Sequence, residues 1–190
     1  MDNDGASQFG EGLVYEDSVP LGWREVGSDI STSELLRTHQ SNERVLRYFA
    51  ALDEFRGEAA DEEHGHVAHE LTRLEFKTNL LLDMVARLLV EHVSVPAAVP
   101  VKMNGAGIQW CTQAPPAAGS LLSVDIYLNE RYPSPITLYG EVSRVVPVEG
   151  GFQVDLGYRD MSDTLRSWLE KLIFRHHRRL VAHSRQQGRV

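Results

Sequence analysis

The 190-residue sequence has one cysteine, Cys111, and no run of the roughly 20 apolar residues that would cross a bilayer. A single cysteine excludes an internal disulfide framework and metal sites built on several thiolates. Cys111 lies in an apolar segment, where we expect a buried, inert thiol. Residues 1–10 are polar and carry no secretion-signal pattern, so we expect them to be disordered and the protein to be cytoplasmic.

The sequence also lacks the common catalytic motifs. It has no G-x-S-x-G elbow, no Walker A sequence and no G-x-G-x-x-G loop. His64, His66 and His69 are spaced by two and three residues beside an acidic run, whereas zinc-binding helices use pairs four residues apart. A solvated segment is therefore favoured there, and we predict no enzyme, no metal site and no cofactor.

The charge is unevenly distributed. Residues 161–190 hold seven Lys/Arg against two acidic residues, a net charge of +5. Since the whole chain has a net charge of −8, the other 160 residues have a net charge of −13. Such a basic tail can bind anions, nucleic acid or an acidic partner. It can equally be a solvated helix face whose cations suit the carboxyl end of the helix dipole. The second interpretation is favoured, because no base-reading motif accompanies the cations.

The first half of the chain predicts a short strand and then helices. Pro20 is expected to end the strand that begins near Gly12. Ser31 or Thr32 can cap a helix that ends near Gly57.

A heptad repeat follows over residues 67–92, in which apolar residues alternate at intervals of three and four. Apolar residues at positions e and g (Leu82, Leu89 and Met84) widen the stripe beyond a dimer seam. We predict that this helix assembles a homo-oligomer, specifically a tetramer; the alternative is an ordinary buried helix. The predicted oligomerisation residues are Val67, Leu71, Leu74, Thr78, Leu81, Val85 and Leu88.

The second half of the chain alternates apolar and polar residues in short runs separated by Gly- and Pro-rich turns. This pattern is typical of a small antiparallel β-barrel. We predict an α+β fold in which a single domain, residues 11–190, carries a helical insertion at about 31–93. The predicted strands are 99–103, 108–111, 121–128, 136–148 and 152–158, and a last helix begins near Ser162.

Three segments of the second half form one pattern: the strand-turn-strand Val101–Ile108, Gly140–Val145 after an alternating strand, and a closing strand with Gly157 before the last helix. Together they resemble a PilZ domain, the bacterial module associated with cyclic di-GMP. Val14–Trp23 is similar to the opening strand of the atypical, oligomeric PilZ branch, in which helices are inserted into the barrel. The resemblance implies a PilZ-like barrel, a role in cyclic di-GMP signalling and an oligomer.

The sequence departs from the nucleotide-binding residues of ordinary PilZ domains. The [DN]-x-S-x-x-G turn aligns with Lys102, Asn104 and Gly107, so only its glycine is kept. We expect Gly105 and Gly107 to supply positive φ angles there. No arginine precedes the first strand, where an R-x-x-x-R pair is expected. Arg175 and Arg179 have that spacing, but we do not assign them the role, because any helix places such residues on one face.

These departures predict a non-catalytic signalling adaptor that acts through oligomerisation and a protein partner, with direct cyclic di-GMP binding weak or lost. One alternative is a genuine cyclic di-GMP receptor with a rearranged site, which would need the basic tail or a neighbouring subunit's arginine. The other is a nucleic-acid-binding barrel. The net acidity and the lack of aromatic residues interleaved with Lys/Arg disfavour it.

Overall fold

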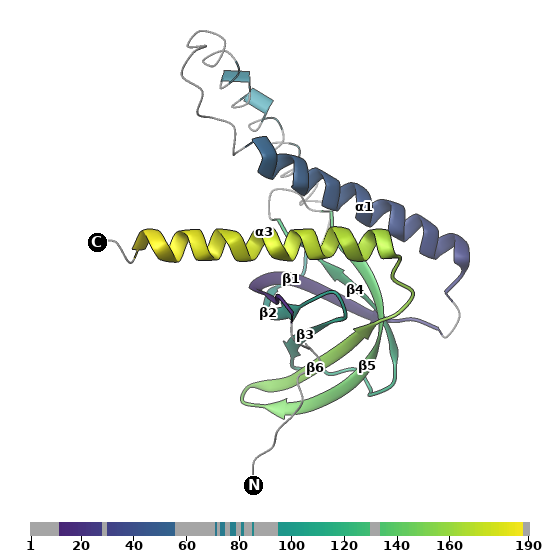
Figure 1. The fold of residues 1–190 in the computed structure, drawn as a ribbon. Helices are drawn as coiled ribbons and strands as arrows, with labels where there is room; N and C mark the ends of the chain where they lie inside the picture. The colour runs from purple at the N-terminus through teal and green to yellow at the C-terminus, as the bar shows by residue number, and fades with distance from the viewer. Residues whose placement is uncertain are drawn as a thin grey trace.

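The computed structural model describes residues 12–27, 30–55, 95–129 and 134–187, together with seven positions between residues 71 and 85. Six antiparallel strands close a barrel in the order β1-β2-β3-β6-β5-β4, which confirms the predicted fold class (Figure 1). Residues 1–10, predicted to be disordered, lie outside the described residues. The strands are β1 (Tyr15–Glu25), β2 (Ala98–Met103), β3 (Gly107–Thr112), β4 (Leu121–Ile126), β5 (Ile136–Val148) and β6 (Gly151–Tyr158).

Strand β1 closes the barrel by pairing with two neighbours. Residues 15–20 pair with β2 and residues 21–25 pair with β4. Pro20 was expected to end this strand, and that prediction is wrong. It lies where β1 changes partner, so its missing N–H removes no bond from the middle of either ladder. Its carbonyl oxygen accepts a hydrogen bond of ordinary length from the Tyr127 backbone N–H, with an N···O distance of 3.0 Å.

The barrel interior is filled by the inward positions of the alternating strands. Leu122, Val124 and Ile126 of β4 are fully buried, as the alternation predicted. On β3 the same period of two places Trp110 in the core and Cys111 on the outer face. Cys111 is exposed, so the expectation of a buried thiol was wrong.

Helix α1 (Thr32–Phe55) begins where the sequence predicted. The Ser31 hydroxyl accepts a hydrogen bond from the Glu34 backbone N–H, at 3.2 Å, which caps the first turn. Asn42 is buried and joins the helix to β5: its amide oxygen and nitrogen bond the backbone N–H and carbonyl of Thr137 at 2.9 and 2.7 Å. This pair of bonds fixes α1 against the barrel.

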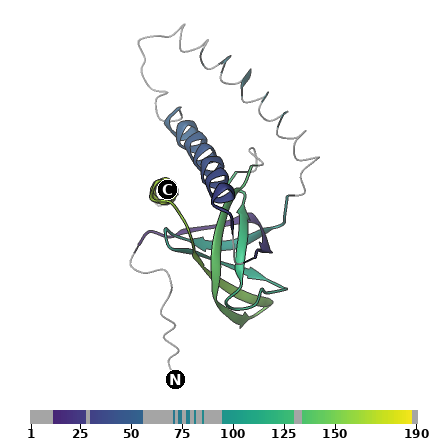
Figure 2. The same cartoon turned by 90° about the vertical axis from the view of Figure 1, so that its right-hand side faces the viewer.

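Helix α3 (Asp163–Gln187) covers the barrel core with one apolar stripe. Leu165, Leu169 and Ile173 are buried in the same cluster as the inward strand residues. Burying each of them stabilises the fold by about 2 kcal/mol. Figures 1 and 2 show α3 lying over the barrel with α1 beside it. Within the described part of the chain, no helix is both long and apolar enough to span a membrane.

Candidate functional site

The turn from Asn104 to Gly107 joins β2 to β3 and is held by hydrogen bonds within the chain. The side-chain oxygen of Asn104 accepts from the backbone N–H groups of Ala106 and Gly107, at 2.8 and 3.1 Å. The Gly105 carbonyl accepts from the Arg166 guanidinium of α3, and the Ala106 carbonyl accepts from the Tyr158 N–H at 2.9 Å. The turn therefore has a structural role: its hydrogen bonds connect the barrel to α3.

Gly107 is required for a reason other than the expected one. Among the described glycines, positive φ angles occur at residues 119, 150 and 151, so the expectation for Gly105 and Gly107 was wrong. A Cβ at Gly107 would instead lie 2.4 Å from the carbonyl oxygen of Leu156 on β6. The backbones of β3 and β6 approach too closely there for any side chain.

Lys102 lies on β2, outside the turn. It is exposed, and its ammonium group pairs with the Glu16 carboxylate of β1 at 3.1 Å. Such a surface ion pair contributes little to stability. The three residues predicted as a ligand site thus have different structural roles. Lys102 lies on the outer face of a strand, the side chain of Asn104 holds the turn, and Gly107 allows two strands to approach closely.

Replacing Asn104 by Ala tests the structural role of the turn. The Gly107 N–H is buried and would lose its acceptor, so we expect a loss of about 2 kcal/mol in the free energy of unfolding. The melting temperature should then fall by about 4–8 °C, measured by circular dichroism. Asn104→Asp keeps an acceptor oxygen in place and should retain most of the stability. A melting temperature unchanged in Asn104→Ala would contradict this role.

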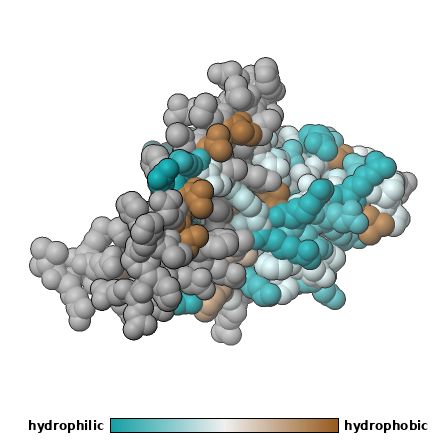
Figure 3. Space-filling view, turned by 90° about the horizontal axis from the view of Figure 1, so that it is seen from above, coloured by the Kyte–Doolittle hydropathy of each residue, from teal (hydrophilic) through white to brown (hydrophobic). Residues whose placement is uncertain are grey.

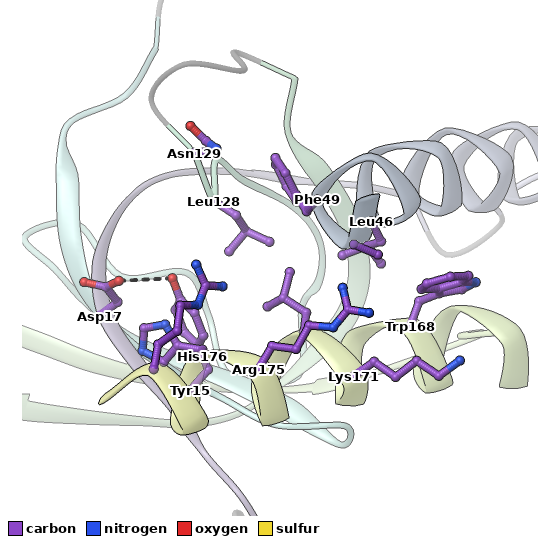
Figure 4. Close-up of a pocket in the computed structure, with 13 residues that line it drawn as sticks. Tyr15, Asp17, Leu46, Phe49, Leu128, Asn129, Trp168, Lys171, Arg175 and His176 are labelled. Atoms are coloured by element: carbon purple, nitrogen blue, oxygen red, sulfur yellow. Dashed lines mark hydrogen bonds between the residues drawn. The ribbon is translucent and has the colours of Figure 1, made fainter. Parts of the chain in front are cut away.

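A groove with a volume of about 200 Å³ lies between α3, α1 and β1, and we call it the α3 groove (Figure 4). Lys102, Asn104 and Gly107 do not line it. Apolar side chains from α1 and from the segment after β4 form one wall, and polar side chains from α3 and β1 face them. The lining residues are Tyr15, Asp17, Leu46, Phe49, Ala50, Leu128, Asn129, Trp168, Lys171, Leu172, Arg175, His176 and Arg179.

The charges along the α3 groove are predominantly positive. Lys171, Arg175 and Arg179 follow one another at four-residue intervals on α3. Among the described lining residues, Asp17 supplies the negative charge. Lys171 also stands over the Trp168 ring, 4.6 Å from its centroid. Because positive side chains outnumber negative ones among these residues, the groove favours an anionic ligand.

Tyr15 and His176 join β1 to α3 at one end of the groove. Their ring centroids are 4.2 Å apart, and a ring nitrogen of His176 lies 3.3 Å from the Glu16 carbonyl oxygen. The Tyr15 hydroxyl donates to the Asp17 carboxylate at 3.2 Å. Burial, reinforced by Asp17, raises the pKa of the Tyr15 hydroxyl, and Arg179 lowers it. The hydroxyl therefore stays protonated at neutral pH and keeps donating to Asp17.

Sequence reasoning missed this groove although it noticed two of its residues. Arg175 and Arg179 were set aside because their spacing alone carries little information. The stronger signal is longer: Trp168, Lys171, Leu172, Arg175, His176 and Arg179 repeat at intervals of three and four. They form a second stripe on α3, beside the buried one.

The inserted segment contains a second candidate site, for assembly. Seven described residues between 71 and 85 are helical, and all are exposed. We call five of them, at heptad positions a and d, the helical ridge: Leu71, Leu74, Thr78, Leu81 and Val85. The four apolar side chains are 60%, 57%, 63% and 51% exposed, in that order. The space-filling view from above shows brown, apolar surface on that face of the molecule (Figure 3).

Other predicted positions on this segment lie outside the described residues. They are Val67 and Leu88 of the predicted seam, Leu82, Met84 and Leu89 at positions e and g, and the histidines His64, His66 and His69. Within the described ranges, no group of three or more His, Cys, Asp or Glu side chains is placed to hold a metal ion.

The closed barrel, the helical insertion after β1 and the covering helix α3 define the PilZ class of fold. Residues 46–186 match the family described as "Atypical PilZ domain, cyclic di-GMP receptor". The chain belongs to this family, which confirms the resemblance found in the sequence and links the chain to cyclic di-GMP signalling. No curated protein matches the chain significantly.

One solved structure supports the same fold. The chain is similar to a protein from Xanthomonas campestris described as a new tetrameric PilZ domain self-assembled through a helical bundle. The identity is 23%, the TM-score is 0.73, and the match covers 92% of this chain and 93% of the other. It also matches the Bacillus subtilis inhibitor of motility MotI/DgrA, with 16% identity, TM-score 0.35 and coverages of 49% and 43%. The PilZ domain of YcgR from Escherichia coli with c-di-GMP matches with 10% identity, TM-score 0.36 and coverages of 52% and 84%.

Proposed function

We propose that this chain is a non-catalytic, cytoplasmic signalling protein of cyclic di-GMP pathways that acts as a homo-oligomer. The observation that carries the proposal is the helical ridge, whose four apolar side chains are each more than half exposed in the single chain. Their three- and four-residue spacing is that of a helix-bundle seam. A second copy of the same helix would remove this surface from water, and burial of apolar area is the main driving force of association.

A tetramer is the proposed state. The Xanthomonas campestris protein, which shares the fold over most of both chains, is described as a tetramer built through a helical bundle. The predicted width of the apolar stripe also favours four helices over two, because apolar e and g residues would stay exposed in a dimer.

The proposed mode of action is contact with a protein partner rather than nucleotide binding at the turn between β2 and β3. Asn104 uses its side-chain oxygen to hold two backbone N–H groups of that turn. Lys102 is paired with Glu16. The groups that replace the ordinary PilZ ligand residues are thus engaged within the chain, which supports weak binding at this position.

A second candidate function, a cyclic di-GMP receptor with a rearranged site, is favoured by one specific observation. The basic tail that such a receptor would need places Lys171, Arg175 and Arg179 along one groove. The same placement gives no support to the nucleic-acid-binding alternative, in which cations and aromatic residues would be interleaved on an open strand surface.

Light scattering of the purified chain across micromolar concentrations tests the assembly. We expect a mass of about four times the 21.3 kDa of one chain. A mass of one chain throughout that range would contradict the proposed function.

A further inference from the structure

The α3 groove lies between two aromatic contacts that join α3 to its neighbours (Figure 4). At one end the Arg47 guanidinium of α1 stands over the Trp168 ring of α3, with its Cζ atom 5.8 Å from the ring centroid. At the other end the Tyr15 ring of β1 lies against the ring of His176. These contacts hold the two helices and β1 in place, so the groove is a preformed feature of the fold.

The apolar wall consists of Leu46 and Phe49 of α1 and Leu128 after β4. The groove has a volume of about 200 Å³, whereas pockets that enclose a small-molecule ligand have roughly 300–1,000 Å³. It is therefore better suited to individual apolar side chains than to a whole organic molecule. Trp, Tyr, Phe and Arg, which are enriched at the centres of protein–protein interfaces, all line it.

The cationic wall has the period of a helix. Lys171, Arg175 and Arg179 are four residues apart, and four helical residues advance about 6 Å, so the cations recur at that interval over about 12 Å. Glutamates four residues apart on a second helix recur at the same interval. A helix that lies along α3 can therefore place a carboxylate opposite each cation.

The two walls together require an amphipathic ligand. Residues three and four apart share one face of a helix, so an apolar stripe and an acidic stripe can lie side by side on it. Helices bind grooves of other proteins by inserting such an apolar stripe. Asp17 is the acidic residue among the described lining residues, and its carboxylate already accepts from the Tyr15 hydroxyl and the Ser18 N–H. Since the three cations outnumber it, an acidic partner is favoured over a basic one.

We propose that the α3 groove is the docking site for an acidic amphipathic helix of a protein partner. The apolar side chains of that helix enter between α1 and α3, and its carboxylates pair with Lys171, Arg175 and Arg179. That the occupant is a protein rests on the proposed function, in which the chain acts through a protein partner. The acidic and apolar character of the occupant follows from the walls of the groove.

A synthetic helix tests the site. The probe is a dye-labelled peptide of about 18 residues, long enough to form a helix in water. It carries Leu at three- and four-residue intervals on one stripe and Glu at four-residue intervals on the next, with Ala elsewhere. Fluorescence anisotropy measures its binding to the full chain at moderate salt. We expect saturable binding that weakens about tenfold or more when either all Glu or all Leu are replaced by Gln, because each change removes one of the two complementary surfaces.

Variants of the chain locate the binding. Arg175→Ala and Arg179→Ala should each weaken binding of the Glu peptide about fivefold, because each removes one charge pair. Arg178→Ala is the matched control and should leave the affinity unchanged: its guanidinium stands over the Phe174 ring, 5.9 Å from the centroid, and does not line the groove. The double variant Arg175→Glu, Arg179→Glu should lose the Glu peptide and bind a peptide with Lys in place of Glu. Misfolding cannot produce this exchange of preference, and melting temperatures confirm that each variant is folded.

Two outcomes of the peptide measurements would overturn the site. They are no binding of the Glu peptide to the wild-type chain at millimolar peptide, and an equal loss in Arg178→Ala and Arg179→Ala. Competition supplies a third. If a mixed-sequence single-stranded oligonucleotide or cyclic di-GMP displaced the Glu peptide as effectively as unlabelled peptide does, the groove would be a nucleotide site and the proposal would be wrong.

Light scattering gives the mass of each sample beside its affinity. A wild-type oligomer that does not bind the Glu peptide overturns the groove site and leaves the proposed assembly standing. A single chain that binds the peptide overturns the assembly and leaves the site standing.

Discussion

Replacing Leu74 and Leu81 together by Asp is expected to convert the proposed oligomer into single chains. Both positions belong to the helical ridge and are predicted at position d of the heptad. In an assembled bundle each chain would bring two carboxylates into an apolar seam, where an unpaired charge costs several kcal/mol. In the single chain the same side chains are 57% and 63% exposed, so the substitutions cost little there. The two substitutions therefore destabilise the assembled bundle much more than they destabilise the single chain.

Sedimentation velocity measures this outcome, and Arg73→Asp is the matched control. Arg73 lies on the same helical segment, outside the ridge, and its replacement changes the charge by the same two units. We expect Arg73→Asp to keep the wild-type mass. If the double variant fails to fold alone, Leu74→Ala serves instead, because a smaller seam should dissociate at higher protein concentration. An unchanged mass in the double variant would show that the ridge is not the seam.

The strands and their inward faces could be predicted because their cause is local. Alternation with a period of two decides which side chains face the core, and β5 spans residues 136–148 as the sequence predicted. The start of α3 could also be predicted from local sequence. The Ser162 hydroxyl caps the helix by accepting a hydrogen bond from the Leu165 backbone N–H at 3.2 Å.

The errors arose where distant parts of the chain decide the outcome. A proline usually interrupts a strand, but whether Pro20 does so depends on which partner β1 has at that residue. Cys111 stands in an apolar segment, yet its place on the outer face follows from the register of β3 against its neighbours. Local composition contains neither fact.

The α3 groove was beyond prediction for the same reason. The spacing of Arg175 and Arg179 was visible, but spacing gives only a shared face of one helix. The role of the two arginines depends on the residues that face them across the groove, and the packing of α3 against α1 and β1 decides which residues these are. The sequence could predict the cationic stripe and not the apolar wall that faces it.

The substitution Gly107→Val is expected to destabilise the chain strongly, whatever the turn binds. The nearest contact of an added Cβ is the Leu156 carbonyl oxygen at 2.4 Å, a backbone atom held in the ladder between β3 and β6. The two strands would have to separate, at a cost of about 3 kcal/mol or more. The melting temperature should fall by about 6–12 °C, followed by circular dichroism.

Gly105→Ala is the matched control for this substitution. The Cβ at that position would meet the carboxylate oxygen of Glu170 at 2.8 Å, and this is the far end of a flexible side chain that can turn away. We therefore expect a change of less than about 1 kcal/mol there. The pair separates a close backbone approach from a general need for glycine in the turn. If Gly107→Val kept the wild-type melting temperature and lost partner or nucleotide binding, the turn would be a recognition site, and the structural role derived from Leu156 would be wrong.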